Sequence, residues 1–191
     1  MTIKNTGSIR TTAQAATPPH AGLSVPSGRY RLHPELSNVA FTAKKLGVFT
    51  IRGTMRVESG TFTVTGPLEH STLHAVLAAD SFKTPMAKRD EHVKSPTLLD
   101  AATYPRIEFD STEVVAGPEG TWEVRGLLAV HGQVAPVVLT VTSTSTSTED
   151  ALVHVRATAQ VDRRVFGVTA LRAAASSMIT IEIDAVGTPV R

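Results

Sequence analysis

The chain has 191 residues, of which 41% are hydrophobic and 19% charged, with 19 basic and 17 acidic side chains. This composition is too apolar for a disordered chain, and the length suits one domain. The longest apolar run, residues 75–79, is far shorter than the roughly 20 residues of a membrane-spanning helix. No basic run exceeds two residues, so we expect no nucleic-acid partner. Cysteine is absent, which excludes disulfides, thiolate catalysis and cysteine zinc sites.

The first 27 residues are the least patterned part of the chain. They contain Lys4 and Arg10 but no acidic residue, are rich in Thr, Ala, Ser and Pro, and lack periodic apolar spacing. We expect a flexible tail over 1–27, followed by one domain over 28–188. A secretory signal needs an apolar core of about seven or more residues. The tail has no such core, so the expected location is cytoplasmic.

From residue 28 onward, apolar and polar residues alternate, which predicts strands with one buried face and one exposed face. The 26 Thr and 22 Val residues also favour a sheet. In chain order, strands are expected over residues 30–33, 39–43, 49–57, 61–65, 73–79, 107–115, 122–131, 137–148, 153–162 and 179–185. Turn-forming residues such as 117–120 separate them. Short strands without intervening helices predict an all-β antiparallel sandwich or barrel.

One segment, residues 86–102, interrupts the strand pattern. It follows Pro85, and the spacing of Met86, Val93 and Leu98-Leu99 with charged residues between them suits one or two helical turns. We therefore expect a short helical insertion that acts as a lid or plug on the β domain.

The interior of the expected barrel admits two interpretations. A barrel of about eight strands is either filled by its own side chains or holds one small ligand. The expected inward residues are mostly small aliphatic ones, and only 5% of the chain is aromatic. Such side chains either leave an apolar cavity, which would prefer a hydrocarbon guest, or interdigitate into a closed core.

Several motifs follow one another in a fixed order along the domain. The densest is Arg89-Asp90-x-His92-x-x-Ser95, with Asp100 and Tyr104-Pro105 after it. The others are Tyr30, Ser37, Phe41, Thr84, Phe109 to Thr112, Gly126 to Leu128, His131-Gly132, Pro136, and Arg163 to Val168. In these motifs, residues 28–185 resemble the YceI-like family of lipid- and polyisoprenoid-binding proteins. The resemblance implies an extended, lipocalin-like barrel of eight antiparallel strands with an elongated apolar pocket for an isoprenoid or similar chain.

The sequence departs from the family pattern at a few positions. His33, Leu36 and Ser37 stand where the family usually has an Asp and a His-Ser pair. Leu98-Leu99 replace two aromatic residues, and Val134 replaces a threonine. These positions bear on the preference for a lipid head group.

The resemblance implies non-enzymatic binding, sequestration or transport of a long-chain apolar lipid, such as a polyisoprenoid, an isoprenoid quinone or a fatty-acyl compound. No cofactor beyond this ligand and no metal is expected. The expected pocket residues are Phe41, Phe49, Ile51, Met55, Leu73, Leu77, Phe109, Leu128, Val130, Leu139, Val155 and Phe166. Arg89, Asp90, His92 and Arg164 are candidates for the head-group end or rim. Dimerisation is common for small β domains, so a homodimer is among the expected partners. No sequence feature locates its interface.

Two other functions stay open on the sequence. His92 and Asp90 have the side chains of an acid-base pair, which would suit a small hydrolase or isomerase acting on an apolar substrate. An Arg-Asp pair at a helix start more often anchors the helix, however. A closed core would instead indicate a protein-interaction module that uses an exposed sheet edge.

Overall fold

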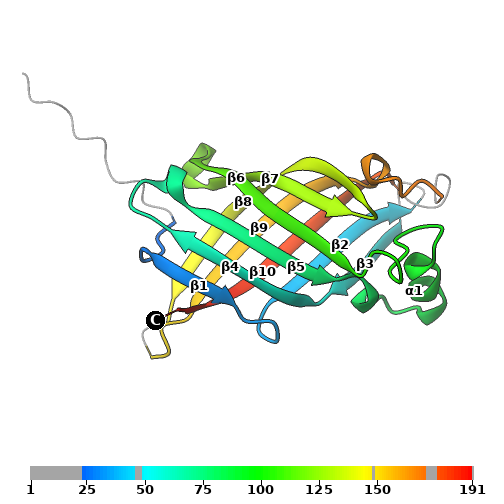
Figure 1. Cartoon of the computed structure of the whole chain (residues 1–191), viewed down its shortest axis with the longest axis horizontal. Coiled ribbons are helices and arrows are strands. Elements are labelled where there is room, and N and C mark those ends of the chain that lie inside the picture. The colour runs from blue at the N-terminus through cyan, green and yellow to red at the C-terminus, as the bar shows by residue number, and fades with distance from the viewer. Residues whose placement is uncertain (1–22, 46–48, 148, 171–175, 191) are drawn as a thin grey trace, which may run out of the picture.

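The computed structural model describes residues 23–45, 49–147, 149–170 and 176–190. They form a β-barrel that carries one α-helix, α1 (Ala87–Lys94), at one end (Figure 1). Its strand segments are β1 (Gly28–Leu32), β2 (Asn38–Lys45), β3 (Phe49–Met55), β4 (Val57–Val64), β5 (Thr72–Ala78), β6 (Arg106–Ala116), β7 (Trp122–Val130), β8 (Gln133–Thr146), β9 (Val153–Asp162) and β10 (Met178–Pro189). Short 3-10 helices are η1 (Leu68–His70), η2 (Ala79–Ser81), η3 (Pro118–Gly120) and η4 (Arg163–Phe166).

The ten segments make up eight barrel strands. β1 and β2 together form one strand interrupted at residues 33–37, and β3 and β4 form one strand that bends at Arg56. β10 pairs with β9 on one side, and with both β2 and β1 on the other. β1 in turn pairs with β4, so the antiparallel ring closes. The predicted all-β fold, an eight-stranded antiparallel barrel with a short helical insertion, is confirmed.

The interruption between β1 and β2 is held onto β10 by hydrogen bonds. The backbone N–H of His33 donates to the carbonyl oxygen of Val186 at 2.8 Å. The N–H of Val186 donates to Oγ of Ser37 at 3.0 Å. The Ser37 hydroxyl thus replaces a missing backbone acceptor, and the strand continues after the break without an unsatisfied amide.

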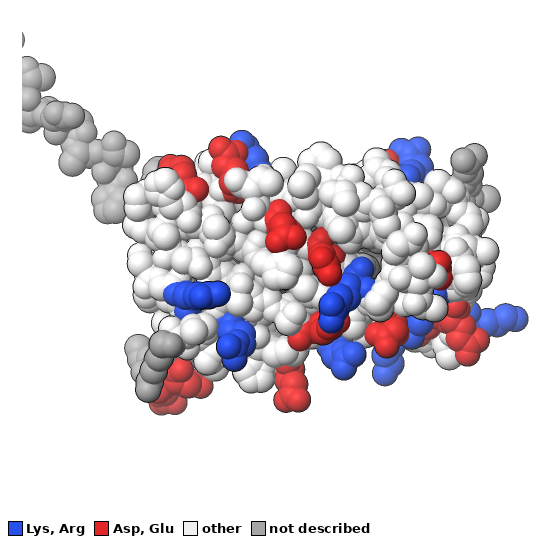
Figure 2. Space-filling view, viewed as in Figure 1, with Lys and Arg blue, Asp and Glu red and all other residues white. Residues whose placement is uncertain are grey.

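The strands present one face to the interior and one to solvent, as their alternation predicts. On β9, Val153, Ala157 and Ala159 are buried, whereas the intervening Arg156 and Thr158 are exposed. The outer surface carries charges of both signs close together (Figure 2). The inward residues of the strands therefore line the barrel core.

The segment between β5 and β6 plugs one end of the barrel. The backbones of Lys83 and Thr54 exchange hydrogen bonds of 2.8 and 3.0 Å, which attaches this segment to β3. After α1, Leu98 and Leu99 are buried in the core cluster that also contains Phe41. η4 lies at the same end of the barrel as α1 (Figure 1). The segment that contains the expected insertion is thus bonded to β3, and its Leu98 and Leu99 pack into the core at this end of the barrel.

Residues 23–27, the described part of the expected tail, contact the barrel. Residues 1–22 lie outside the described residues, but Leu23 packs against the core and Val25 lines the barrel interior. The N–H of Ser24 donates to Oγ1 of Thr144 at 2.9 Å. This segment therefore packs on the barrel, because the side chains of Leu23 and Val25 contact its apolar interior. Within the described ranges, no helix is long and apolar enough to cross a membrane.

Candidate functional site: an apolar cavity along the barrel

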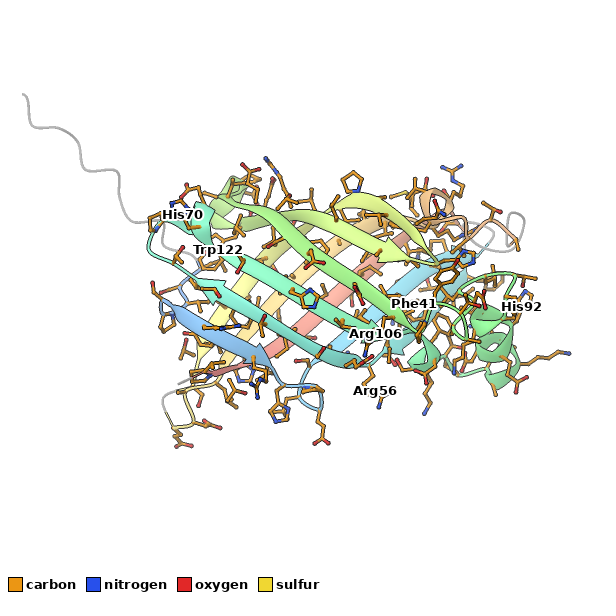
Figure 3. The ribbon with its side chains drawn as sticks, viewed as in Figure 1. Phe41, Arg56, His70, His92, Arg106 and Trp122 are labelled. Atoms are coloured by element: carbon orange, nitrogen blue, oxygen red, sulfur yellow. The ribbon has the colours of Figure 1, made fainter. Side chains whose placement is uncertain are left out.

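A cavity of about 460 Å³ extends through the barrel interior. At one end it is lined by Leu68, Trp122 and Val25, which we call the Trp122 end. At the other it is lined by residues of α1 and η4, which we call the α1 end. Figure 3 labels Trp122 and His92 at these opposite ends. The volume falls within the roughly 300–1,000 Å³ that small-molecule sites occupy, so the barrel interior is not a closed core.

Small side chains leave this space open. Ala43 on β2, Ala75 on β5, Ala157 and Ala159 on β9, and Ala185 on β10 all line the cavity. Larger aliphatic residues at these positions would reach toward the barrel axis and fill it. The polar lining residues are few, and an apolar cavity with few polar partners favours a hydrocarbon guest over water.

Most of the predicted pocket residues do line the cavity. These are Phe41, Ile51, Met55, Leu73, Leu77, Phe109, Leu128, Val130, Leu139, Val155 and Phe166. Phe49 does not, and its assignment to the pocket is corrected here. It is 65% exposed and pairs with Lys45 at the last rung of the β2–β3 ladder. Phe49 keeps the phase of Ile51 and Met55, but it is the first residue of β3 and its side chain is exposed.

Two of the four predicted rim residues lie at the cavity. Arg89 and His92 line it together with Val93, because positions i, i+3 and i+4 share one face of a helix. His92 is exposed as well, so the cavity reaches the surface beside α1. Arg164 lies elsewhere: its guanidinium pairs with Asp162 at 2.6 Å, and it does not line the cavity.

Asp90, the fourth predicted rim residue, is turned away from the cavity. Its carboxylate accepts hydrogen bonds from the backbone N–H of Thr84 at 3.0 Å and from the Thr84 hydroxyl at 2.7 Å. Burial by itself raises the Asp90 pKa, but the Thr84 hydrogen bonds and the charges of Lys94 and Arg89 outweigh it, so the pKa lies below its usual value. Asp90 therefore anchors the start of α1 as an ionised group.

The acid-base pair considered for catalysis is not assembled. Within the described residues, no hydrogen bond joins Asp90 to His92. The two hydrogen bonds that the Asp90 carboxylate accepts both come from Thr84. Nor do the described ranges contain a cluster of three or more His, Asp or Glu side chains placed to hold a metal ion.

Arg163 belongs to the motif of residues 163–168 but was not among the predicted rim residues, and it does line the cavity. Arg163 is buried, and its guanidinium donates to the carbonyl oxygens of Ser176, at 3.0 Å, and of Val168. Burial lowers its pKa, while the charge of Asp162 counteracts this effect. The alternation along β9 indicates this position, because Val161 faces inward and residue 163 has the same phase.

Other missed lining residues come from both ends. Leu98 and Leu99, which stand where the family has aromatics, line the α1 end. Trp122 lines the opposite end, in phase with Val124 on β7. The hydroxyl residues Thr63, Ser71 and Thr72 also line the cavity.

Comparison with known proteins places these features in a family. The sequence matches the YceI-like domain over residues 30–187. UPF0312 proteins of Pseudomonas savastanoi pv. phaseolicola and Vibrio cholerae are 37% and 33% identical to it over 105 residues, which are 54% of this chain and 55% of each relative. The match thus spans about half the length of these curated relatives.

Solved structures share the fold. BcnA of Burkholderia cenocepacia superposes with a TM-score of 0.72 and 16% identity, over 82% of this chain and 99% of that one. A polyisoprenoid binding domain from Saccharophagus degradans gives a TM-score of 0.58 and 14% identity, over 84% and 98%. The Campylobacter jejuni YCEI protein gives 0.56 and 13%, over 99% of both chains. Since the family match covers every barrel strand and the α1 segment, the chain belongs to the YceI-like family.

Proposed function

We propose that the protein binds a long-chain apolar lipid inside its barrel, and that it sequesters or transports this lipid without chemical change. A polyisoprenoid, an isoprenoid quinone and a fatty-acyl compound all have the required hydrocarbon chain. The observation that carries the proposal is the elongated cavity, whose lining is almost entirely aliphatic and aromatic. A structural neighbour described as a polyisoprenoid binding domain supports the same class of ligand.

The cavity volume limits the size of the bound chain. An engineered apolar cavity of about 150 Å³ accepts benzene, which has six carbons. The cavity of about 460 Å³ is roughly three times larger, so it suits a chain of roughly 15–20 carbons. At about 0.8 kcal/mol per buried methylene, such a chain contributes roughly 12–16 kcal/mol, against association costs of roughly 4–15 kcal/mol. Binding is therefore tightest for chains that occupy most of the cavity.

The placement of Asp90 supports binding rather than catalysis. An acid-base enzyme would need a carboxylate or imidazole poised toward the substrate. Asp90 instead accepts its hydrogen bonds from Thr84. Among the described residues, His92 is the one imidazole or carboxylate that lines the cavity. The non-enzymatic function thus agrees better with the side-chain contacts than the hydrolase or isomerase alternative does.

Native mass spectrometry of protein purified without detergent, followed by solvent extraction, tests this function. We expect a stoichiometric adduct that releases a long-chain lipid. The same spectra report whether the barrel is a monomer or a homodimer. Bare protein that also fails to bind added long-chain prenols or fatty alcohols would overturn the proposal.

A matched pair of variants tests whether the lipid lies in the barrel. Ala157→Phe places a ring in the cavity, whereas Thr158→Phe places the same ring on the outer face of β9. We expect Ala157→Phe to lose at least tenfold in lipid affinity and Thr158→Phe to bind as the wild type does. Equal affinity of both variants would place the lipid outside the barrel.

A further inference from the structure

The ionisable residues that line the cavity are all basic, and all lie at one end. They are Arg89 and His92 on α1 and Arg163 on η4. Within the described ranges, no Asp or Glu lines the cavity. An elongated apolar cavity with cationic side chains at one end is polarised along its length, which matters for any guest that has a polar head.

The acidic residues next to these basic side chains do not line the cavity. Glu91, next to His92, is exposed at the surface, whereas those next to the two arginines are bound to other groups. Asp90, next to Arg89, accepts both of its hydrogen bonds from Thr84. Asp162, next to Arg163, accepts hydrogen bonds from the backbone N–H and the guanidinium of Arg164, the shortest at 2.6 Å. Neither carboxylate lines the cavity, so no carboxylate of the described residues lies beside the Arg89 guanidinium within the cavity.

Among the described residues, no charged side chain lines the opposite end. Its lining consists of apolar residues such as Trp122 and Leu68, together with the hydroxyls of Ser71 and Thr72. The Ser71 hydroxyl already accepts a hydrogen bond from the N–H of Thr65 at 3.2 Å. This end therefore suits a hydrocarbon tail better than a charged head.

From this polarity we infer that the natural ligand is an acidic single-chain amphiphile, whose carboxylate or phosphate head lies beside Arg89 and His92 while its tail extends toward Trp122. The inference rests on the proposed lipid-binding function. A guanidinium forms strong charge-assisted hydrogen bonds with either anion. Because His92 is exposed, the head stays near solvent while the tail is buried.

Matched pairs of probes separate the head-group effect from binding of the chain. Palmitic acid is compared with hexadecanol, and farnesyl phosphate with farnesol, by calorimetric titration of the full chain. We expect each acid to bind about tenfold more tightly than its alcohol, the lower end of the effect of a charge-assisted hydrogen bond. The pair with the larger ratio indicates whether the site prefers carboxylate or phosphate.

Variants of α1 assign this preference to specific side chains. Arg89→Gln should lower the affinity for the acids about tenfold and leave the affinity for the alcohols within twofold, and His92→Gln should act in the same direction. Lys88→Gln is the control, because Lys88 is exposed on the same helix and does not line the cavity. Arg163 is left unchanged, since its hydrogen bonds to Ser176 and Val168 hold the backbone around η4.

The orientation can be read from the single tryptophan of the chain. A fatty acid brominated near its methyl end should quench Trp122 fluorescence more strongly than one brominated near its carboxylate. Equal or reversed quenching would overturn the orientation.

The outcomes separate the two proposals. Acids and alcohols that bind equally, with no effect of Arg89→Gln, would overturn the acidic head group and leave lipid binding intact. If no member of either pair binds, lipid binding itself is wrong.

Discussion

The Thr84 hydroxyl donates a hydrogen bond of 2.7 Å to the buried carboxylate of Asp90, and the Thr84 backbone N–H donates a second one to the same oxygen. Lys83, the residue before Thr84, is bonded to Thr54 of β3. The first turn of α1 is thereby tied to the barrel wall through one carboxylate. Because Arg89 and His92 lie on the same helix, this attachment also fixes the position of these two basic side chains at the cavity.

Removing the Asp90 carboxylate should loosen α1 without unfolding the barrel. In Asp90→Ala, we expect amides of residues 84–94 to exchange with solvent faster, while amides of β7 to β9 keep their protection. Hydrogen-exchange mass spectrometry measures both regions in one experiment. Glu91→Ala is the matched control, since Glu91 is the exposed neighbour of Asp90. Similar exchange in the two variants would mean that Asp90 does not anchor the helix.

Leu98 anchors the other half of the plug, and its truncation should be costly. The side chain is completely buried in the core cluster, so Leu98→Ala should destabilise the protein by about 2–5 kcal/mol. For a chain of this size, this corresponds to a Tm lower by roughly 5–15 °C. Leu36→Ala removes the same atoms from a leucine that is 52% exposed. If its Tm falls as far as that of Leu98→Ala, burial of the plug is not the cause.

The Asp162–Arg164 pair should make stability depend on pH in the acid range. Hydrogen bonds from the Arg164 guanidinium and backbone lower the Asp162 pKa to about 2. Because the folded pKa lies below the unfolded one, the stabilisation is complete above about pH 4 and is lost as the pH falls toward 2. The Tm difference between wild type and Asp162→Asn should therefore shrink over this range. Glu69→Gln, at the other end of the barrel, is the control, and a difference that persists below pH 2 would contradict the assignment.

Much of the fold follows from local alternation in the sequence. The strands of the hairpin from β9 to β10 were predicted within a few residues, because polar and apolar residues alternate there without interruption. The break at residues 33–37 was not predicted as an interruption of one strand. It depends on Ser37 reaching the N–H of Val186, a contact between residues far apart in the sequence.

The site was less predictable than the fold. Alternation predicts the face of the sheet on which a side chain lies, but not whether that side chain is buried. Phe49 therefore fits the inward pattern of β3, although its side chain is exposed. Arg164 was predicted at the rim, but the alternation of β9 continues to Arg163, which is the arginine that lines the cavity. The cavity volume depends on alanines of separate strands facing one another, and no single stretch of sequence encodes that arrangement.

The affinity for neutral lipids should rise with chain length until the chain fills the cavity. Each added methylene contributes about 0.8 kcal/mol when buried, which is about a fourfold gain in affinity. In a series of saturated fatty alcohols, we expect this gain to continue until the chain fills the cavity of about 460 Å³, and to stop at roughly 15–20 carbons. Alcohols isolate the hydrocarbon contribution, because they lack the acidic head.

Calorimetric titration or competition with a fluorescent lipid measures this series. Ala157→Phe reduces the cavity near its middle, so the gain should stop at shorter chains in this variant and at the wild-type length in Thr158→Phe. A gain that continues unchanged well beyond roughly 20 carbons would mean that the chain leaves the barrel or that the wall expands around it. Affinity independent of length would instead show that the hydrocarbon is not buried, because apolar surface that stays in water contributes nothing to binding.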